Sequence, residues 1–178
     1  MTNQPHVMIL GVGNLLFTDE GFGIRVISKI LNEFDMPDNV SVEDGGVLGV
    51  NLLGIISRAD HLIVVDAVRN KGNPGDLYRL EGEAVPERIR AKNSLHQVDF
   101  LEALTLCNAL EKVPETVILG VEPEDIHTLS IELTPTIEAK IEPMIEMVLA
   151  ELDRLGVVCT KGVCKDVSCD PLKNCQNR

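Results

Sequence analysis

Acidic side chains and glycines follow the apolar runs of the sequence, and residues of these types can bind a metal ion or activate a water molecule. The clusters are Gly11-Val12-Gly13-Asn14 with Thr18-Asp19-Glu20-Gly21, then Glu43-Asp44-Gly45-Gly46, Asp66, and Glu122-Pro123-Glu124. Carboxylates that share one cleft repel each other unless a cation or a proton relieves the repulsion. His96, in the polar stretch 93–97, is the candidate imidazole. Carboxylate oxygens with an imidazole nitrogen suit Zn, Ni or Mn better than Cu(I).

The elements that must position these residues alternate along the chain. Apolar runs typical of buried strands lie at 7–10, 40–42, 61–65 and 116–121. Stretches in which apolar residues recur at helical spacing lie at 23–34, 50–57, 98–110 and 136–155. Alternating strands and helices build right-handed crossovers and a parallel sheet. The sequence therefore predicts an α/β fold, a three-layer α/β/α sandwich with a mostly parallel twisted sheet.

Two local features refine this prediction. The segment 76–80 is expected to be a further strand, at an antiparallel edge or in a hairpin. Pro143 lies inside the predicted helix 136–155 and should kink it, because proline cannot donate the helical hydrogen bond.

Parallel strands end at the same edge of a sheet, and ligands of open α/β sheets bind outside these carboxyl ends. We therefore expect the acidic clusters to be neighbours. Each residue also has a plainer interpretation: Glu20 as an acid near a helix N-terminus, Asp44 as a turn residue, and Asp66 as the cap of a strand. A single histidine such as His96 is more often an ordinary surface or core residue.

The Gly11-x-Gly13 turn after the first strand also resembles a dinucleotide-binding fingerprint. Leu16 stands where that fingerprint has its third glycine, and Glu20 would bring negative charge close to a pyrophosphate. A nucleotide-binding module is therefore the less favoured alternative.

Composition limits the class of protein. The chain has 178 residues, of which 44% are hydrophobic and 25% charged, as expected of one globular domain. A net charge of −12 and a scarcity of aromatic residues argue against a nucleic-acid partner. No apolar run approaches the roughly 20 residues of a membrane span, and the N-terminus lacks the features of a signal peptide. We expect a cytoplasmic protein that does not bind a membrane.

Four of the five cysteines lie close together near the C-terminus: Cys159, Cys164, Cys169 and Cys175. Their spacing does not match paired Cys-x-x-Cys zinc motifs. We expect a single domain over 1–156 and a flexible cysteine-containing tail over 157–178, with a metal site or redox pairing of the tail as alternatives.

The acidic clusters are part of a longer pattern that resembles the nickel-iron hydrogenase maturation proteases. The resemblance begins at Gly11-Val12-Gly13-Asn14-Leu15-Leu16-Phe17-Thr18-Asp19-Glu20-Gly21-Phe22-Gly23 and covers roughly residues 6–156. It continues through Asp44-Gly45-Gly46, His61-Leu62-Ile63-Val64-Val65-Asp66-Ala67, Ser94-Leu95-His96-Gln97, Gly120-Val121-Glu122-Pro123 and Leu133-Thr134-Pro135. One departure is Val47, where the family often has a small hydroxyl residue.

The resemblance implies an endopeptidase that removes a C-terminal extension from a nickel-loaded hydrogenase large-subunit precursor. It matches Glu20, Asp66 and His96 to the family's metal-contacting, catalytic positions. It also matches Asp44, Gly45 and Gly46 to a loop associated with substrate recognition. It implies no permanent cofactor, with nickel supplied by the precursor, and we expect a monomer. A non-catalytic nickel-sensing chaperone of the precursor is the alternative.

Overall fold

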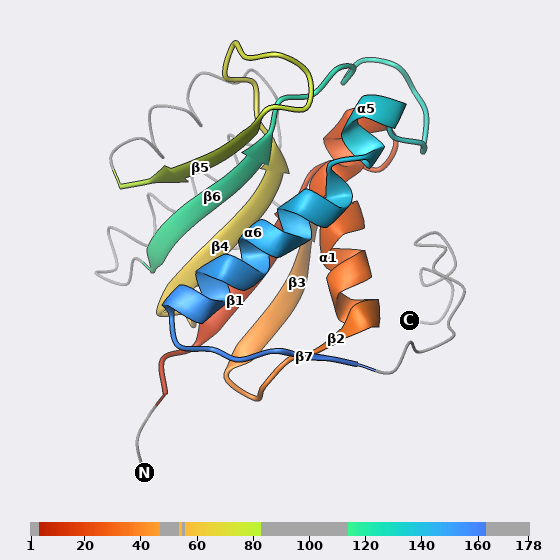
Figure 1. The fold of residues 1–178 in the computed structure, drawn as a ribbon. Helices are drawn as coiled ribbons and strands as arrows, with labels where there is room; N and C mark the ends of the chain where they lie inside the picture. Colours follow the sequence, from red (N-terminus) through yellow and green to blue (C-terminus); the bar gives the residue numbers. More distant parts are fainter. Residues whose placement is uncertain (1–3, 47–53, 55, 83–113, 163–178) are drawn as a thin grey trace.

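The computed structural model describes residues 4–46, 54, 56–82 and 114–162, and a five-stranded sheet is its centre. The strand order is β3-β1-β4-β6-β5 (Figure 1). The strands are β1 Val7–Val12, β3 Val40–Gly46, β4 His61–Ala67, β5 Leu77–Glu81 and β6 Glu115–Val121. Strands β3, β1, β4 and β6 pair in parallel, whereas β5 pairs antiparallel with β6. The predicted α/β fold and its antiparallel edge strand are confirmed.

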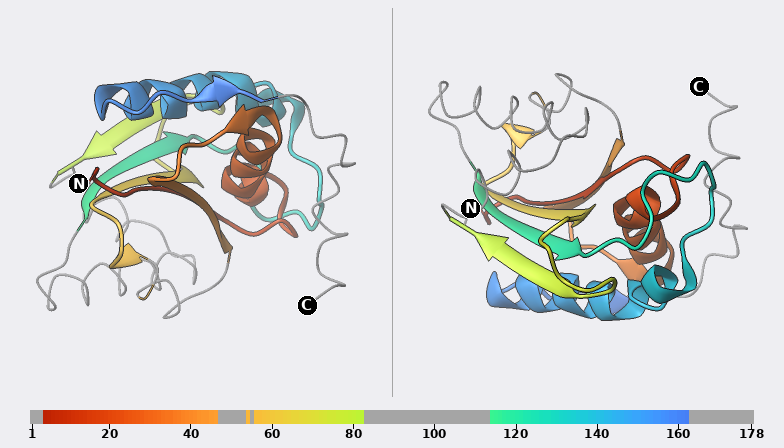
Figure 2. Two further views of the ribbon diagram at one scale, coloured as in Figure 1. Left: turned by 90° about the horizontal axis from the view of Figure 1, so that it is seen from below. Right: turned by 90° about the horizontal axis from the view of Figure 1, so that it is seen from above.

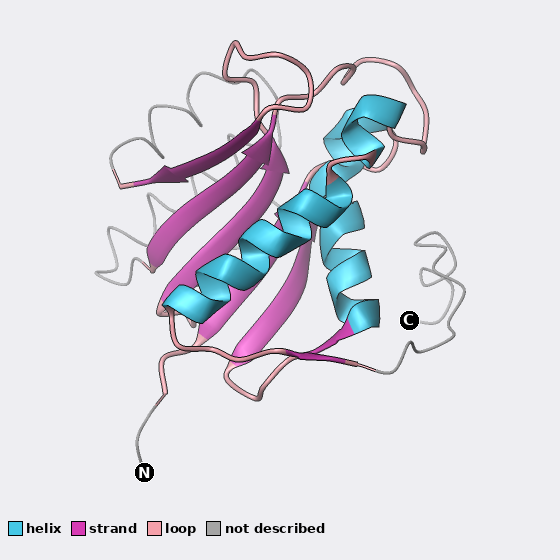
Figure 3. Ribbon diagram, in the orientation of Figure 1, coloured by secondary structure: helices cyan, strands magenta, loops and turns pink. Residues whose placement is uncertain are grey.

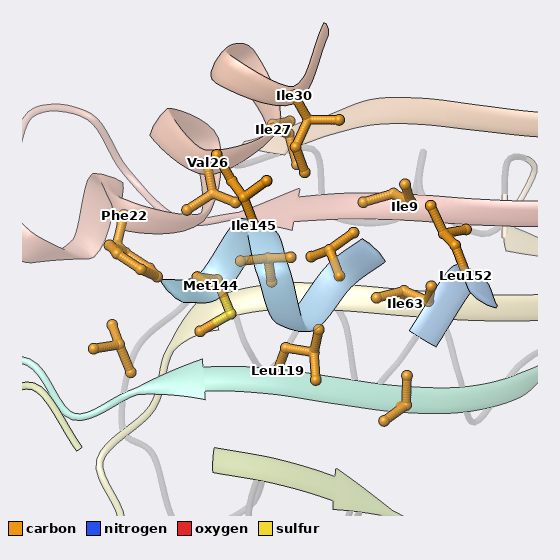
Figure 4. Close-up of a cluster of buried hydrophobic side chains, with 14 of the residues drawn as sticks. Ile9, Phe22, Val26, Ile27, Ile30, Ile63, Leu119, Met144, Ile145 and Leu152 are labelled. Atoms are coloured by element: carbon orange, nitrogen blue, oxygen red, sulfur yellow. The ribbon is translucent and has the colours of Figure 1, made fainter. Parts of the chain in front are cut away.

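Both faces of the sheet are buried. Side chains of a strand alternate between faces, so Ile9 and Ile63 pack with α1 (Phe22–Glu33) and α6 (Ile141–Arg154), whereas Met8 and Leu62 pack on the opposite face with Ile56. Figure 4 shows the first of these clusters, and Figure 2 places α1 and α6 on the same face of the sheet. Of the predicted helix 50–57, residues 50–53 and 55 lie outside the described residues, as does all of 98–110.

The predicted helix 136–155 is two helices. The structure has α5 (Pro135–Glu138) and α6, with a break at Ala139 and Lys140 (Figure 3). Pro143 is the physical reason, because it has no N–H for the carbonyl of Ala139 and its ring would clash with that carbonyl in a continuous helix. Proline is tolerated in the first turn of a helix, and α6 begins only two residues before it.

The chain beyond Gly156 first packs back onto the domain. Val157 is buried in the core, and β7 (Thr160–Lys161) pairs antiparallel with β2 (Phe34–Asp35). The expected tail over 157–178 therefore begins with a segment that has a place in the fold. Residues 163–178 lie outside the described part of the chain, and with them three of the four clustered cysteines. Within the described ranges, no helix is both long and apolar enough to cross a membrane.

Two glycines bring the first turn of α1 into contact with the sheet. A Cβ on Gly23 would lie 2.2 Å from the carbonyl oxygen of Val65 and 2.4 Å from that of Val12. A Cβ on Gly11 would lie 2.7 Å from the carbonyl oxygen of Gly23. Because these neighbours are backbone atoms, the helix could not approach β1 and β4 this closely with any other residue at position 23.

Replacing Gly23 by alanine should therefore destabilise the protein by about 3 kcal/mol, as expected when a group is forced into a packed site. Urea unfolding measures this free energy. Gly54→Ala is the matched control, since its Cβ would meet no described atom within 4 Å. Equal stability of Gly23→Ala and the wild type would contradict the described contact of α1 with the sheet.

Candidate functional site

The acidic clusters lie at one edge of the sheet, as predicted. In the parallel register Gly11 of β1 is level with Asp44 of β3 and with Val65 of β4. Asp66 follows Val65 and is level with Gly120 of β6. The carboxyl ends of four neighbouring strands therefore carry the predicted residues side by side, in the place where open α/β sheets bind ligands.

Glu20 is placed by a short turn that folds back onto the end of β1. It belongs to the 3₁₀ helix η1 (Thr18–Gly21), and its amide donates to the carbonyl oxygen of Phe17 at 2.8 Å. Its own carbonyl accepts from the amide of Asn14 at 3.2 Å. Gly13 has φ +142°, and a Cβ there would lie 1.8 Å from the carbonyl oxygen of Glu20. Only a glycine at position 13 therefore lets the carbonyl of Glu20 come this close to the turn.

Asp19, the neighbour of Glu20, is fully buried and its carboxylate is surrounded by donors. The amides of Glu124, Asp125 and Thr134 donate to it at 3.0, 2.8 and 2.8 Å. The Thr134 hydroxyl also donates to it, at 3.0 Å. The amide of Asp19 in turn donates to the carbonyl of Asp125 at 3.0 Å. A buried carboxylate is stable only when so satisfied, and these bonds tie η1 to the segment after β6.

The segment after β6 is itself ordered by a local turn. The Asp125 carboxylate accepts hydrogen bonds from Thr128 and from the amide of His127, and these bonds lower the pKa of Asp125 to about 2. A depressed carboxyl pKa contributes stability above the unfolded value and loses it as the pH falls through the folded value. At neutral pH the Asp125 carboxylate is therefore ionised, and its hydrogen bonds stabilise the turn.

Glu122 organises the loop that follows β4. It is 7% exposed, and its Oε2 accepts hydrogen bonds from the amides of Asn70 and Gly72 at 2.7 and 3.1 Å. The hydroxyl of Tyr78 donates to the same oxygen at 2.8 Å. The sequence analysis placed Glu122 among the acidic residues at the edge of the sheet. In the structure its carboxylate holds the backbone of the loop after β4.

Asp66 stands one residue before the end of β4 and is 8% exposed. The strand is held between β1 and β6, and η1 lies in contact with it. Glu20 and Asp66 are two of the three predicted metal-contacting residues. The structure thus brings together the segments that carry them. His96, the third, lies outside the described residues. In the described ranges alone, no three His, Cys, Asp or Glu side chains form a group that could hold a metal ion.

The Asp44-Gly45-Gly46 segment forms the end of β3, beside the end of β1. A β-bulge opens the pairing of β3 with β1 at this point, and a Cβ on Gly45 would lie 3.0 Å from the carbonyl oxygen of Gly11. Gly46 adopts φ +34°, which favours glycine. Asp44 is exposed, and partial desolvation of its carboxyl raises its pKa, an effect opposed by a hydrogen bond from the amide of Gly46. Val47 lies outside the described residues.

The turn after β1 does not form a phosphate cradle. Its backbone amides donate within the chain: that of Asn14 to Glu20, that of Leu16 to the Asn14 side chain at 3.0 Å, and that of Phe17 to the Asn14 carbonyl at 3.2 Å. Dinucleotide sites use such amides for the phosphates. The nucleotide-binding alternative therefore loses its structural basis.

Replacing Asp19 by asparagine should destabilise the protein by about 3 kcal/mol, because one acceptor oxygen becomes an amide that faces backbone donors. Chemical unfolding at neutral pH measures the loss. Asp153→Asn, at an exposed position of α6, is the control and should change stability by less than about 0.5 kcal/mol. An Asp19→Asn protein as stable as the control variant would show that the hydrogen bonds between the two segments are unimportant.

Comparisons with known proteins identify relatives of this chain. A family model described as "Hydrogenase maturation protease" (HycI) matches residues 24–151. The hydrogenase 2 maturation protease of Escherichia coli K12 is 41% identical over 153 residues, which cover 85% of this chain and 93% of that protein. The hydrogenase expression/formation protein HupD of Thiocapsa roseopersicina is 39% identical over 163 residues, which cover 90% of this chain and 74% of that protein.

Solved structures show the same fold. The hydrogenase maturating endopeptidase HybD from Escherichia coli superposes with a TM-score of 0.84 at 39% identity. The match covers 88% of this chain and 97% of that one. The hydrogenase maturation protease HybD from Thermococcus kodakarensis superposes with a TM-score of 0.69 over 82% of this chain. At 24% identity that second likeness supports the fold alone.

Proposed function

Because the chain belongs to the hydrogenase maturation protease family, we propose that it removes a C-terminal extension from the large-subunit precursor of a nickel-iron hydrogenase. We propose further that nickel carried by the precursor is the element it recognises. The observation that carries this proposal is the placement of Glu20 and Asp66, on two segments in contact, at the carboxyl edge of the sheet.

In this proposal Glu20, Asp66 and His96 offer two carboxylates and an imidazole to the nickel of the precursor. This donor set suits a divalent nickel ion. The metal belongs to the substrate, so the protease needs no permanent cofactor. A large subunit that has not received nickel would lack the group that the three residues bind, and it would be left uncut.

The proposed reaction is hydrolysis of one peptide bond. Binding nickel brings the scissile carbonyl to Glu20 and Asp66, and a metal ion close to that carbonyl would polarise it. A water molecule attacks the carbonyl carbon and gives its proton to a carboxylate acting as general base. The C–N bond then breaks, and the proton passes to the leaving amine. The products are a shortened large subunit and a free C-terminal peptide.

We assign substrate recognition to Asp44, Gly45 and Gly46. Asp44 is exposed and lies near the end of β3, level with Gly11 of β1, the strand that leads into the turn with Glu20. The two glycines carry no side chains, so a peptide can approach the backbone closely here. We also propose that the protein works as a monomer in the cytoplasm, where thiols stay reduced and precursor cysteines can hold nickel.

Glu20→Gln and Asp66→Asn should each slow the processing of nickel-loaded precursor by about 100-fold or more, because each removes a charged metal-binding oxygen while preserving side-chain shape. Mass spectrometry of the precursor after incubation measures the cut. The matched control is Glu146→Gln, at an exposed position of α6, which should process at the wild-type rate.

Thermal unfolding of each variant separates a local loss of chemistry from a loss of fold. Folded Glu20→Gln and Asp66→Asn proteins that both cut at the wild-type rate would remove these residues from the site. A wild-type protein that binds nickel-loaded precursor and leaves its mass unchanged would instead identify the nickel-sensing chaperone.

A further inference from the structure

Three large apolar side chains are exposed on neighbouring loops beside the proposed site. Leu16 is 55% exposed, Leu129 74% and Ile131 45%. We call these three side chains the apolar patch. Burying such apolar side chains would be favourable, so leaving them in water costs free energy. Grouped exposed apolar residues commonly mark an interaction surface.

The backbone under the apolar patch is held in place. Phe17 and Ser130 form a parallel bridge, in which the amide of Ser130 donates to the carbonyl of Leu16 at 3.1 Å and the amide of Thr18 to that of Ser130 at 2.8 Å. The bridge places the backbone of Leu16 beside that of the loop residues Leu129 and Ile131, so the three exposed side chains start from neighbouring backbone.

Two further hydrogen bonds anchor the same backbone to the domain. The hydroxyl of Thr18 donates to the carbonyl of Thr128 at 2.7 Å, and the guanidinium of Arg25 in α1 donates to the carbonyl of Ile131. The apolar patch is thus formed before any partner arrives, and a partner would not have to order it.

The apolar patch is continuous with the segment that carries Glu20. The amide of Glu20 donates to the carbonyl of Phe17, next to Leu16. The carboxylate of Asp19 binds the amides of Asp125 and Thr134, on either side of the loop that carries the other two patch residues. The apolar patch and Glu20 therefore belong to directly connected segments at this edge of the sheet.

We propose that the apolar patch docks a short apolar segment of the hydrogenase precursor close to the bond that is cut. This inference rests on the proposed function and deepens it, because it assigns part of the affinity to apolar contact in addition to nickel. Two points of attachment raise the effective concentration of the second group once the first is bound.

Size and charge both disfavour a second copy of this chain as the occupant. A stable interface takes roughly 800 Å² from each partner, whereas three side chains supply a few hundred Å² at most. Exposed Glu132 directly follows Ile131 of the apolar patch, and two chains of net charge −12 repel each other. A short segment without acidic side chains fits both conditions.

The Leu129→Ser/Ile131→Ser double variant tests the proposal on the full chain with nickel-loaded precursor. Removing contact made equally in the ground and transition states raises KM and leaves kcat unchanged. We expect KM to rise about tenfold, as the loss of two interface side chains predicts. The matched control is Leu31→Ser/Val158→Ser, which removes exposed apolar side chains elsewhere and should keep KM within about twofold of wild type.

The docking role is overturned by an unchanged KM, or by a fall in kcat at constant KM. It is also overturned if sedimentation finds a wild-type dimer that the double variant dissociates, because the occupant would then be a second copy. Leu129→Ser alone serves if the double variant does not fold.

Binding of fluorescently labelled precursor separates this inference from the proposed function. If the wild type cuts nothing, the proposed function fails, and the binding measurement still decides the docking role. A dissociation constant about tenfold weaker for the patch variant supports docking, and an equal dissociation constant overturns it.

Discussion

The buried carboxylate of Asp19 joins the two segments from which the carboxyl edge of the sheet is built. One segment runs from β1 through η1, and the other runs from β6 to α5. They are more than a hundred residues apart in the chain, and Asp19 binds the second through backbone amides at three positions. Because Glu20 is its neighbour, the same hydrogen bonds that satisfy a buried charge also fix the backbone of a proposed nickel ligand.

Close backbone contacts complete this arrangement. Gly13 lets the carbonyl of Glu20 approach the turn, and Gly23 lets α1 approach β1 and β4. The parallel register then sets Asp66 and Asp44 on the strands either side of β1. The glycines of the first motif therefore have a steric role: they allow the close backbone contacts that bring carboxylates together at one edge of the sheet. A protein that reads a metal on its substrate requires such preorganised donors, because ordering them on binding would cost affinity.

The sheet, and the edge at which the acidic clusters meet, could be predicted from the sequence, because the periodicity of apolar residues is local. The parallel topology then predicted that the acidic residues at the ends of the strands would be neighbours. The hydrogen bonds of Asp19 could not be predicted, because no local pattern pairs a residue with donors 105 to 115 positions away. The pairing of β2 with β7 was missed because each strand has two residues. A kink at Pro143 within one helix was predicted, whereas the structure has a break at Ala139 and Lys140, because proline disturbs the turn that precedes it. The roles of Glu20, Asp66 and His96 stay predictions.

The central claim is that the protease recognises nickel on its substrate through carboxylates at the edge of the sheet. The most direct measurement is the mass of the large-subunit precursor after incubation with the protease, in parallel samples with and without nickel in the precursor. The account predicts loss of a C-terminal peptide only from the nickel-loaded precursor. Equal cleavage of both samples would contradict it.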